Sequence, residues 1–293
     1  MKPSDRGLYM KQGKHEVISF IKHDIRSGIL SKWKKLVPFI LILLCFCIYM
    51  VYQCKESIES GLVEGMPTTA DMILFIFRGM REYVPELDPV FVIPVTWLLI
   101  QMYIAFVIGG YAYEDLGAYG QQFILRSTKK GHWFFGKCIY CVVNVIGYYV
   151  VAYFIIGICS LVFGTLSFQL TPDIGNIMSD MDVTVISEKQ FVMHLIILPI
   201  MTSLNISFIQ MLLSLWIKPT LSFVFVMSYM TISAYWATPA MIGNFSMILR
   251  FSPVVMEGIR LTTALWVEGI VFFVFILASW VLMRRYDFID KNE

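Results

Sequence analysis

One stretch of the chain has the spacing of a phosphate-binding loop. Residues 131–138, GHWFFGKC, fit the pattern G-x-x-x-x-G-K but have Cys138 where such a loop carries Ser or Thr. A phosphate loop follows a buried strand, wraps its backbone N–H groups around phosphate, and uses the hydroxyl to hold Mg²⁺. Here no strand pattern precedes the stretch, and Trp133 and two phenylalanines occupy the cradle. We interpret it as an interfacial aromatic anchor and predict that this chain binds no cofactor itself and is not an enzyme.

Cysteine, histidine and acidic side chains offer few other candidates for chemistry. Cys138 and Cys141 form a C-x-x-C pair inside an apolar run, with no second ligand pair at metal-binding spacing, so we predict a structural role and no metal site. His194 and Glu268 also lie inside apolar runs, close enough to one end that we expect both to reach water. The sequence contains neither H-E-x-x-H nor G-x-S-x-G. The residues therefore indicate no catalytic set.

Composition indicates where this chain resides. Its 293 residues are 58% hydrophobic and 15% charged, whereas soluble domains are about 45–50% apolar and about 25% charged. A chain this apolar cannot cover its surface with polar groups, so much of it must face lipid. The net charge of +2 is too small to indicate nucleic-acid binding.

Six apolar stretches are long enough to cross a bilayer, whose hydrocarbon core of ~30 Å needs about 20 residues of helix. Alternation of period two is absent, which excludes a barrel pattern. The sequence therefore predicts an all-α polytopic membrane protein, a single transmembrane domain over 1–293 with six transmembrane helices. The expected spans are 36–53, 91–113, 138–163, 191–217, 219–238 and 264–283.

Basic residues predict the orientation of these spans. With six spans, 17 of the 23 Lys and Arg residues lie on the side that holds both termini, the 114–137 loop and Lys218. The other side has six, together with an acidic excess in 54–90. The positive-inside rule then places both termini in the cytoplasm.

Three further segments are apolar without being able to span. In 14–31 a stripe of Val and Ile at every fourth position opposes basic residues, which predicts an amphipathic helix in the cytoplasmic interface. Residues 68–83 predict a helix packed on the outer face of the bundle. Residues 239–263 are interrupted by proline and glycine, and predict outer re-entrant or surface helices.

The segment 113–137 carries the most informative pattern. An acidic pair ends the second span, a short helix of mixed character is expected over 116–125, and a basic turn leads into the third span. This arrangement resembles permease subunits of type-2 ABC (ATP-binding cassette) exporters, in which an acidic residue opens a cytoplasmic coupling helix that an Arg-Ser turn and a Gly-Lys follow. By this resemblance the ATPase-coupling residues are Glu114, Asp115, Gly117, Gln121, Gln122, Leu125, Arg126 and Ser127.

The resemblance covers nearly the whole chain. The family has a connecting helix before the first span, like 14–31, and outer re-entrant helices before the last span, where Pro253, Glu257 and Arg260 match its pattern. It ends in a short charged tail, like 284–287. The outer segment 54–90 is longer than in many members of the family, so the resemblance does not predict the structure of the outer face.

The resemblance implies partners that the residues alone do not show. These are cytoplasmic ABC ATPase subunits that bind ATP and Mg, and a second permease chain, identical or homologous, within the lipid bilayer of a bacterial plasma membrane. Two other classes stay open: a membrane sensor or immunity protein that transports nothing, and a secondary carrier. The transported substrate stays open among peptide, lipid, antibiotic and ion, as does the direction of transport.

Overall fold

The computed structural model describes residues 24, 33–86, 90–117, 130–179, 181–252 and 254–285. Within these ranges every regular element is a helix, and pairing between extended segments is limited to two isolated bridges. The longer helices are α2 (Leu36–Glu59), α3 (Thr69–Phe77), α4 (Val95–Gly109), α7 (Lys130–Phe163), α10 (Leu198–Trp216), α11 (Pro219–Tyr235) and α12 (Leu261–Arg285). The shorter ones are η2 (Trp33–Lys35), α5 (Tyr111–Gly117), α8 (Pro172–Ser179), η3 (Val183–Val185), α9 (Glu188–Val192), the π-helical η4 (Met193–Ile197), η5 (Ile242–Ser246) and η6 (Ile248–Arg250).

Five helical stretches of the described chain are long and apolar enough to cross a membrane. They are Trp33–Glu59, Val95–Leu116, Trp133–Phe163, Glu188–Trp216 and Leu261–Val281. The prediction of six spans therefore holds only in part. The exception is α11, whose 17 residues reach only about 25 Å at 1.5 Å per residue. This helix ends at Tyr235, and Pro239 lacks the N–H that would pair with the Tyr235 carbonyl if the helix continued.

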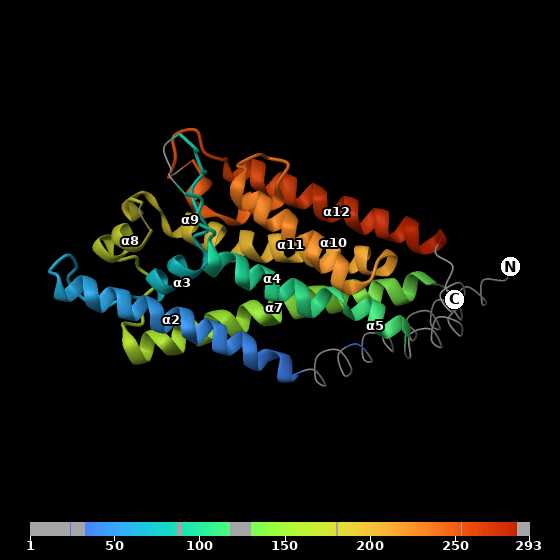
Figure 1. Cartoon of the computed structure of the whole chain (residues 1–293), viewed down its shortest axis with the longest axis horizontal. Coiled ribbons are helices and arrows are strands. Elements are labelled where there is room, and N and C mark those ends of the chain that lie inside the picture. Colours follow the sequence, from blue (N-terminus) through green and yellow to red (C-terminus); the bar gives the residue numbers. More distant parts are fainter. Residues whose placement is uncertain are drawn as a thin grey trace, which may run out of the picture.

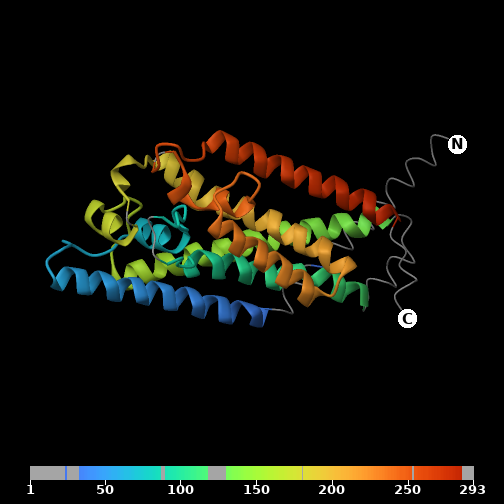
Figure 2. The same ribbon diagram turned by 45° about the horizontal axis from the view of Figure 1, so that its top comes forward.

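The long helices run side by side and alternate in direction along the chain (Figures 1 and 2). One end of the bundle gathers the start of α2, helix α5, the start of α7, the turn between α10 and α11, and the end of α12. The opposite end holds α3, α8 and α9. Helix α10 is central, since it packs against α4, α7, α11 and α12. This alternation brings segments far apart in sequence together at each end.

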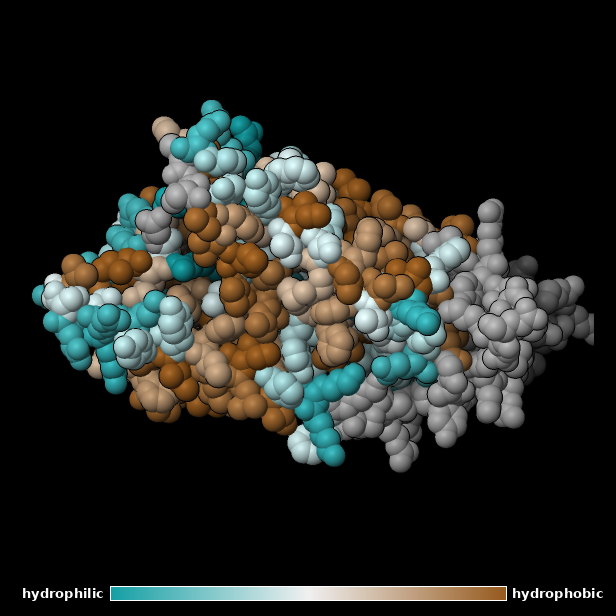
Figure 3. Space-filling view, in the orientation of Figure 1, coloured by the Kyte–Doolittle hydropathy of each residue, from teal (hydrophilic) through white to brown (hydrophobic). Residues whose placement is uncertain are grey.

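The two outermost helices, α2 and α12, present large apolar side chains outward. In the 18-residue apolar window of α12 only 17% of the residues are buried, and Trp266, Phe273 and Leu277 are exposed. Leu41 and Ile48 are similarly exposed on α2. Figure 3 shows apolar residues over much of the middle of the viewed face, with hydrophilic residues gathered toward its ends. Lipid is the environment in which such a surface is stable.

The stretch 68–83 contains one helix, α3, and all nine of its residues are buried. Thr68 and Asp71 form a reciprocal capping box at its start, and the Thr171 N–H donates to Asp71 Oδ1 at 3.0 Å. Thr69 exchanges a 2.7 Å hydrogen bond with Ser160 of α7. Because its polar end groups are satisfied inside the protein, this short helix can be buried without exposing its backbone.

The segment 239–263 contains two 3₁₀ turns, η5 and η6, rather than a pair of α-helices. A bridge between Phe251 and Ile259 closes the loop that follows them. Proline at 239 and glycine at 243 explain why no longer helix forms. The amphipathic helix predicted for 14–31 lies outside the described residues, apart from Asp24.

The expectation that His194 and Glu268 reach water is wrong. Their exposed fractions are 1% and 0%. Hydropathy locates a residue along a span but does not tell which neighbour covers it. The Phe251 ring packs against His194, with the two ring centroids 4.2 Å apart, and α10 packs against Glu268. Cys138 and Cys141 are buried free thiols of α7.

Candidate functional site

The two helices that flank residues 118–129 meet at one end of the bundle. Gly109 is the last residue of α4 and Gly110 separates it from the short α5, and a Cβ at Gly109 would overlap the Gln210 side chain of α10. Glycine therefore lets α4 and α10 approach closely just before the chain enters α5. On the other side α7 begins at Lys130, earlier than the predicted start at residue 138, so the G-x-x-x-x-G-K stretch is helical.

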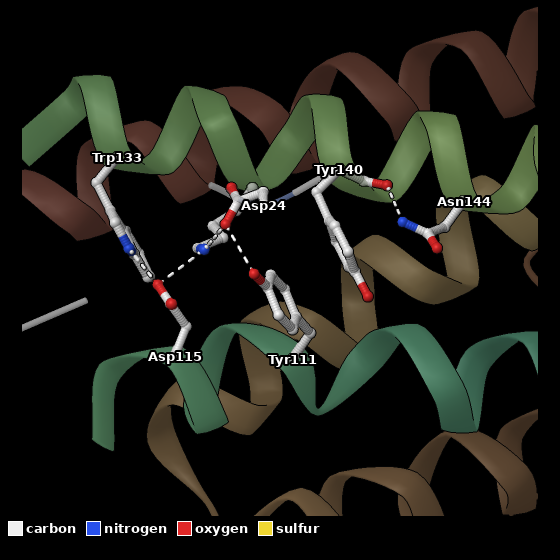
Figure 4. A network of polar contacts seen from close by, with 7 residues as sticks. Asp24, Tyr111, Asp115, Trp133, Tyr140 and Asn144 are labelled. Carbon is white, nitrogen blue, oxygen red and sulfur yellow. Dashed lines mark hydrogen bonds and ion pairs between the residues drawn. The ribbon is translucent and has the colours of Figure 1, made fainter. Parts of the chain in front are cut away.

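Three buried charges join these helix ends to the N-terminal segment (Figure 4). Lys137 Nζ of α7 lies 2.5 Å from Asp24 Oδ1 and 2.8 Å from Asp115 Oδ2 of α5. The exposed fractions of the three side chains are 1% for Lys137, 3% for Asp24 and 6% for Asp115. One lysine thus bridges two carboxylates that lie 91 positions apart in the sequence. We call Asp24, Asp115 and Lys137 the charge cluster.

Aromatic side chains complete the coordination of the charge cluster. Trp133 Nε1 donates to Asp115 Oδ2 at 2.9 Å, and the Tyr111 hydroxyl donates to Asp24 Oδ1 at 2.9 Å. The lysine ammonium lies 4.5 Å from the Tyr111 ring centroid and 5.3 Å from that of Trp133, within cation–π range. These rings exclude water from the ion pairs, which strengthens the attraction between the charges. For the same reason, removing one member of a pair would leave a buried charge without a partner, at a large cost in stability.

The charge cluster carries one more negative group than positive. Burial raises the pKa of Asp24, and the attraction and hydrogen bond of Lys137 act in the opposite direction. Asp24 Oδ2 is buried and has no hydrogen-bond partner among the described residues. The arrangement offers a rigid joint between three segments.

The structure separates the two acids that the sequence pairs. Asp115 points into the charge cluster, whereas Glu114 is exposed on α5. Both lie within α5, which begins at Tyr111, and Asp115 pairs with Lys137 of α7. Gly117 is the last residue of α5, and Gln121, Gln122, Leu125, Arg126, Ser127 and Pro253 lie outside the described residues.

The predicted outer residues lie away from the charge cluster. Glu257 and Arg260 are exposed in the connection before α12, at the opposite end of the bundle from α5 (Figure 1). They therefore do not form one site with Glu114 and Asp115.

Comparison with known proteins assigns the family. A family model described as "Protein of unknown function (DUF2705)" matches residues 89–289, more than half of the chain. The chain belongs to the DUF2705 family. Searches of curated proteins and of solved structures found no match. The DUF2705 region contains Asp115 and Lys137, whereas Asp24 precedes it.

A second polar group of this DUF2705 chain surrounds a proline in the middle of the bundle. Pro199 lacks the N–H that would pair with the Leu195 carbonyl, and the Tyr153 hydroxyl of α7 donates to that carbonyl at 2.8 Å instead. The π-helical η4 ends at Ile197, two residues before the proline. Tyr149 of α7 donates to the Pro199 carbonyl at 2.9 Å, and Gln101 of α4 bonds Tyr149 at 3.1 Å. Proline inside an apolar run was the only sequence signal for this feature.

A buried arginine organises the opposite end of the bundle. Arg250 donates to the Ser233 carbonyl at 2.7 Å, to the Ala234 carbonyl and to the Asn244 side chain, and so binds the C-terminal end of α11. It also bonds the Met80 carbonyl at 3.2 Å. Burial lowers the pKa of Arg250 to about 10, which leaves it charged at neutral pH. In the sequence, Arg250 is one of the six basic residues on the predicted outer side, and nothing marks it as buried.

Proposed function

We propose that this protein is the membrane-spanning permease subunit of an ATP-driven ABC transporter, an exporter. It would form the translocation pathway with a second, identical or homologous, permease chain. ATP and Mg²⁺ would bind to separate cytoplasmic ATPase subunits. The protein would be a multi-pass plasma-membrane protein of a bacterium, with both termini in the cytoplasm.

The charge cluster is the observation that best supports the proposal. A permease of this kind must transmit motion from an ATPase bound near 114–127 into the bundle, so the flanking helices must be fixed to it. Lys137 joins α5 and α7 across residues 118–129 and also holds Asp24 of the N-terminal segment. A force applied to the connecting residues would therefore move α5 and α7 together. Two features of the sequence add to this argument: the excess of basic residues on the side that holds both termini, and the resemblance of 113–137 to the coupling segment of type-2 ABC permeases.

The test is assembly of this chain with a cytoplasmic ABC ATPase subunit from the same bacterium. We expect the two to co-purify and the complex to hydrolyse ATP in lipid. Glu114→Gln changes an exposed carboxylate at the proposed contact and should lower co-purification several-fold, as rim charges set association. Glu56→Gln, an exposed carboxylate at the opposite end of α2, is the matched control and should have no effect.

Three results would contradict the proposal. If the ATPase does not co-purify with the parent chain, the permease assignment fails and the sensor or immunity class is favoured. If the complex assembles but Glu114→Gln and Glu56→Gln behave alike, the ATPase does not contact α5. Solute movement in vesicles without any ATPase would indicate a secondary carrier.

A further inference from the structure

Glu268 is a carboxylate enclosed inside the membrane-spanning part of the protein. It lies on α12, has an exposed fraction of 0%, and faces α10. Thr202 Oγ1 donates to Glu268 Oε1 at 2.5 Å. Asn205 Nδ2 donates to Glu268 Oε2 and, at 3.1 Å, to the main-chain carbonyl of Glu268. Three polar residues thus join two helices within an otherwise apolar contact.

No cationic side chain of the described residues lies within 4.0 Å of this carboxylate. The titratable groups close enough to feel its charge are two neutral phenols, Tyr149 of α7 and Tyr229 of α11. An ionised carboxylate without a counter-charge is strongly disfavoured at this depth. The site therefore requires one positive charge that the described protein does not supply.

The remaining acceptors distinguish a metal ion from a proton. Asn205 has an exposed fraction of 1%, yet its Oδ1 has no hydrogen-bond partner. Rotating this amide by half a turn would exchange Nδ2 and Oδ1 and direct the oxygen at the carboxylate and the Glu268 carbonyl. A proton would neutralise Glu268 with the amide oriented as it is, whereas a metal ion would use the rotated amide. A metal ion would contact both carboxylate oxygens, the hydroxyl, the amide oxygen and the main-chain carbonyl.

We propose that Glu268, Thr202 and Asn205 form a site for one alkali-metal cation, with Na⁺ as the probe, between α10 and α12. An all-oxygen set is the type that hard cations prefer. A single carboxylate balances one positive charge, so a monovalent ion leaves the interface neutral and a divalent ion does not. Because so little of α12 is buried, an ion shared with α10 would contribute strongly to its attachment. This proposal does not depend on an ATPase partner.

The experiment measures thermal unfolding of the full-length protein in detergent at fixed ionic strength. Sodium chloride replaces choline chloride stepwise at constant pH, and the melting temperature is recorded. A ligand that binds only the folded state raises that temperature with a saturable dependence on its concentration. We expect such saturation for the parent, and no sodium-dependent rise for Glu268→Gln, which keeps the shape of the side chain.

Matched variants separate the site from general salt effects. Thr202→Val removes one ligand without a change in volume and should weaken sodium binding at least about tenfold, since even indirect support of a metal is worth that much. Thr202→Ser keeps the hydroxyl and should bind nearly as well. Glu56→Gln removes an exposed carboxylate and should leave the sodium response unchanged.

Three outcomes would overturn the proposal. One is the absence of any sodium response in the parent, measured also by direct binding of radioactive sodium. Another is an equal response in the parent and in Glu268→Gln. The third is a melting temperature that depends on pH through Glu268 but not on sodium, which would mean that the site holds a proton only.

Discussion

Replacing Lys137 with methionine should produce the largest loss of stability of any substitution in the charge cluster. Methionine keeps much of the aliphatic volume but leaves Asp24 and Asp115 enclosed together without a cation. Breaking a buried ion pair by removing one member costs about 3–5 kcal/mol. Exposed fractions of 1–6% for the three side chains mean that solvent screens this loss little. We therefore expect a loss within that range at neutral pH.

The size of this loss should depend on pH. Burial raises the pKa of Asp24 above its ordinary value of 3.8. The contribution of Asp24 to the stability of the folded protein is therefore complete below pH 3.8, and it is lost as the pH rises through the raised pKa. Lys137 lowers that pKa, so Lys137→Met should raise it further and extend the loss to higher pH. The stability deficit of the variant should therefore grow from acid to neutral pH.

The assay is reversible unfolding in mixed detergent and SDS, followed by tryptophan fluorescence at several pH values. Lys55→Met, an exposed lysine of α2, is the control and should stay within about 0.5 kcal/mol of the parent. Adding Asp24→Asn to Lys137→Met should recover about 1 kcal/mol or more, because one uncompensated charge is gone. A deficit below about 0.5 kcal/mol, or one equal at pH 5 and pH 8, would refute this reasoning.

Three smaller predictions can be checked in the same unfolding assay. Tyr153→Phe leaves the Leu195 carbonyl unpaired beside the proline and should cost about 1–3 kcal/mol. Gly164→Ala, just after the end of α7, would push a Cβ into the main-chain oxygen of Pro67 in the α2–α3 connection and should destabilise, whereas Gly157→Ala, inside α7 and facing open space, should stabilise by up to about 1 kcal/mol; equal effects would contradict the packing. Arg250→Met leaves buried carbonyls at the end of α11 without donors and should cost about 1–3 kcal/mol for each carbonyl left unpaired, while an unchanged stability would mean that water replaces the lost donors.

Hydropathy located the long helices well because a span needs a fixed length of apolar chain. It located their ends less well. Helix α7 continues back to Lys130 because Trp133 and Phe134 are buried against the bundle, and a helix in such an environment need not stop where its apolar run begins. Helix α11 is shorter than its apolar run, and Pro239 lacks the N–H that would pair with the Tyr235 carbonyl if the helix continued.

The site residues were harder to predict, for a physical reason. Glu114 and Asp115 are adjacent in sequence, but successive residues on a helix point about 100° apart, so only Asp115 meets the lysine. Asp24 and Lys137 are 113 positions apart, and nothing in either local pattern indicates the other. Lys137 looked like one of many cytoplasmic basic residues. A buried ion pair depends on two segments that are distant in the sequence, whereas hydrophobic periodicity describes a single segment at a time.

The polar contacts of α10 explain how a membrane bundle of this composition can have one arrangement. Between helices in lipid, apolar packing gains little from the exclusion of water, so hydrogen bonds and close packing must select the neighbours. Helix α10 has such contacts on two sides: Ser203 binds Gln101 of α4 at 2.5 Å and Tyr149 of α7 at 2.9 Å, while Thr202 binds Glu268 of α12. Ser203 and Thr202 are consecutive and face different helices. A rotation of α10 about its axis would break both sets together, so the central helix is fixed in register by side chains that a hydropathy profile counts only as small interruptions.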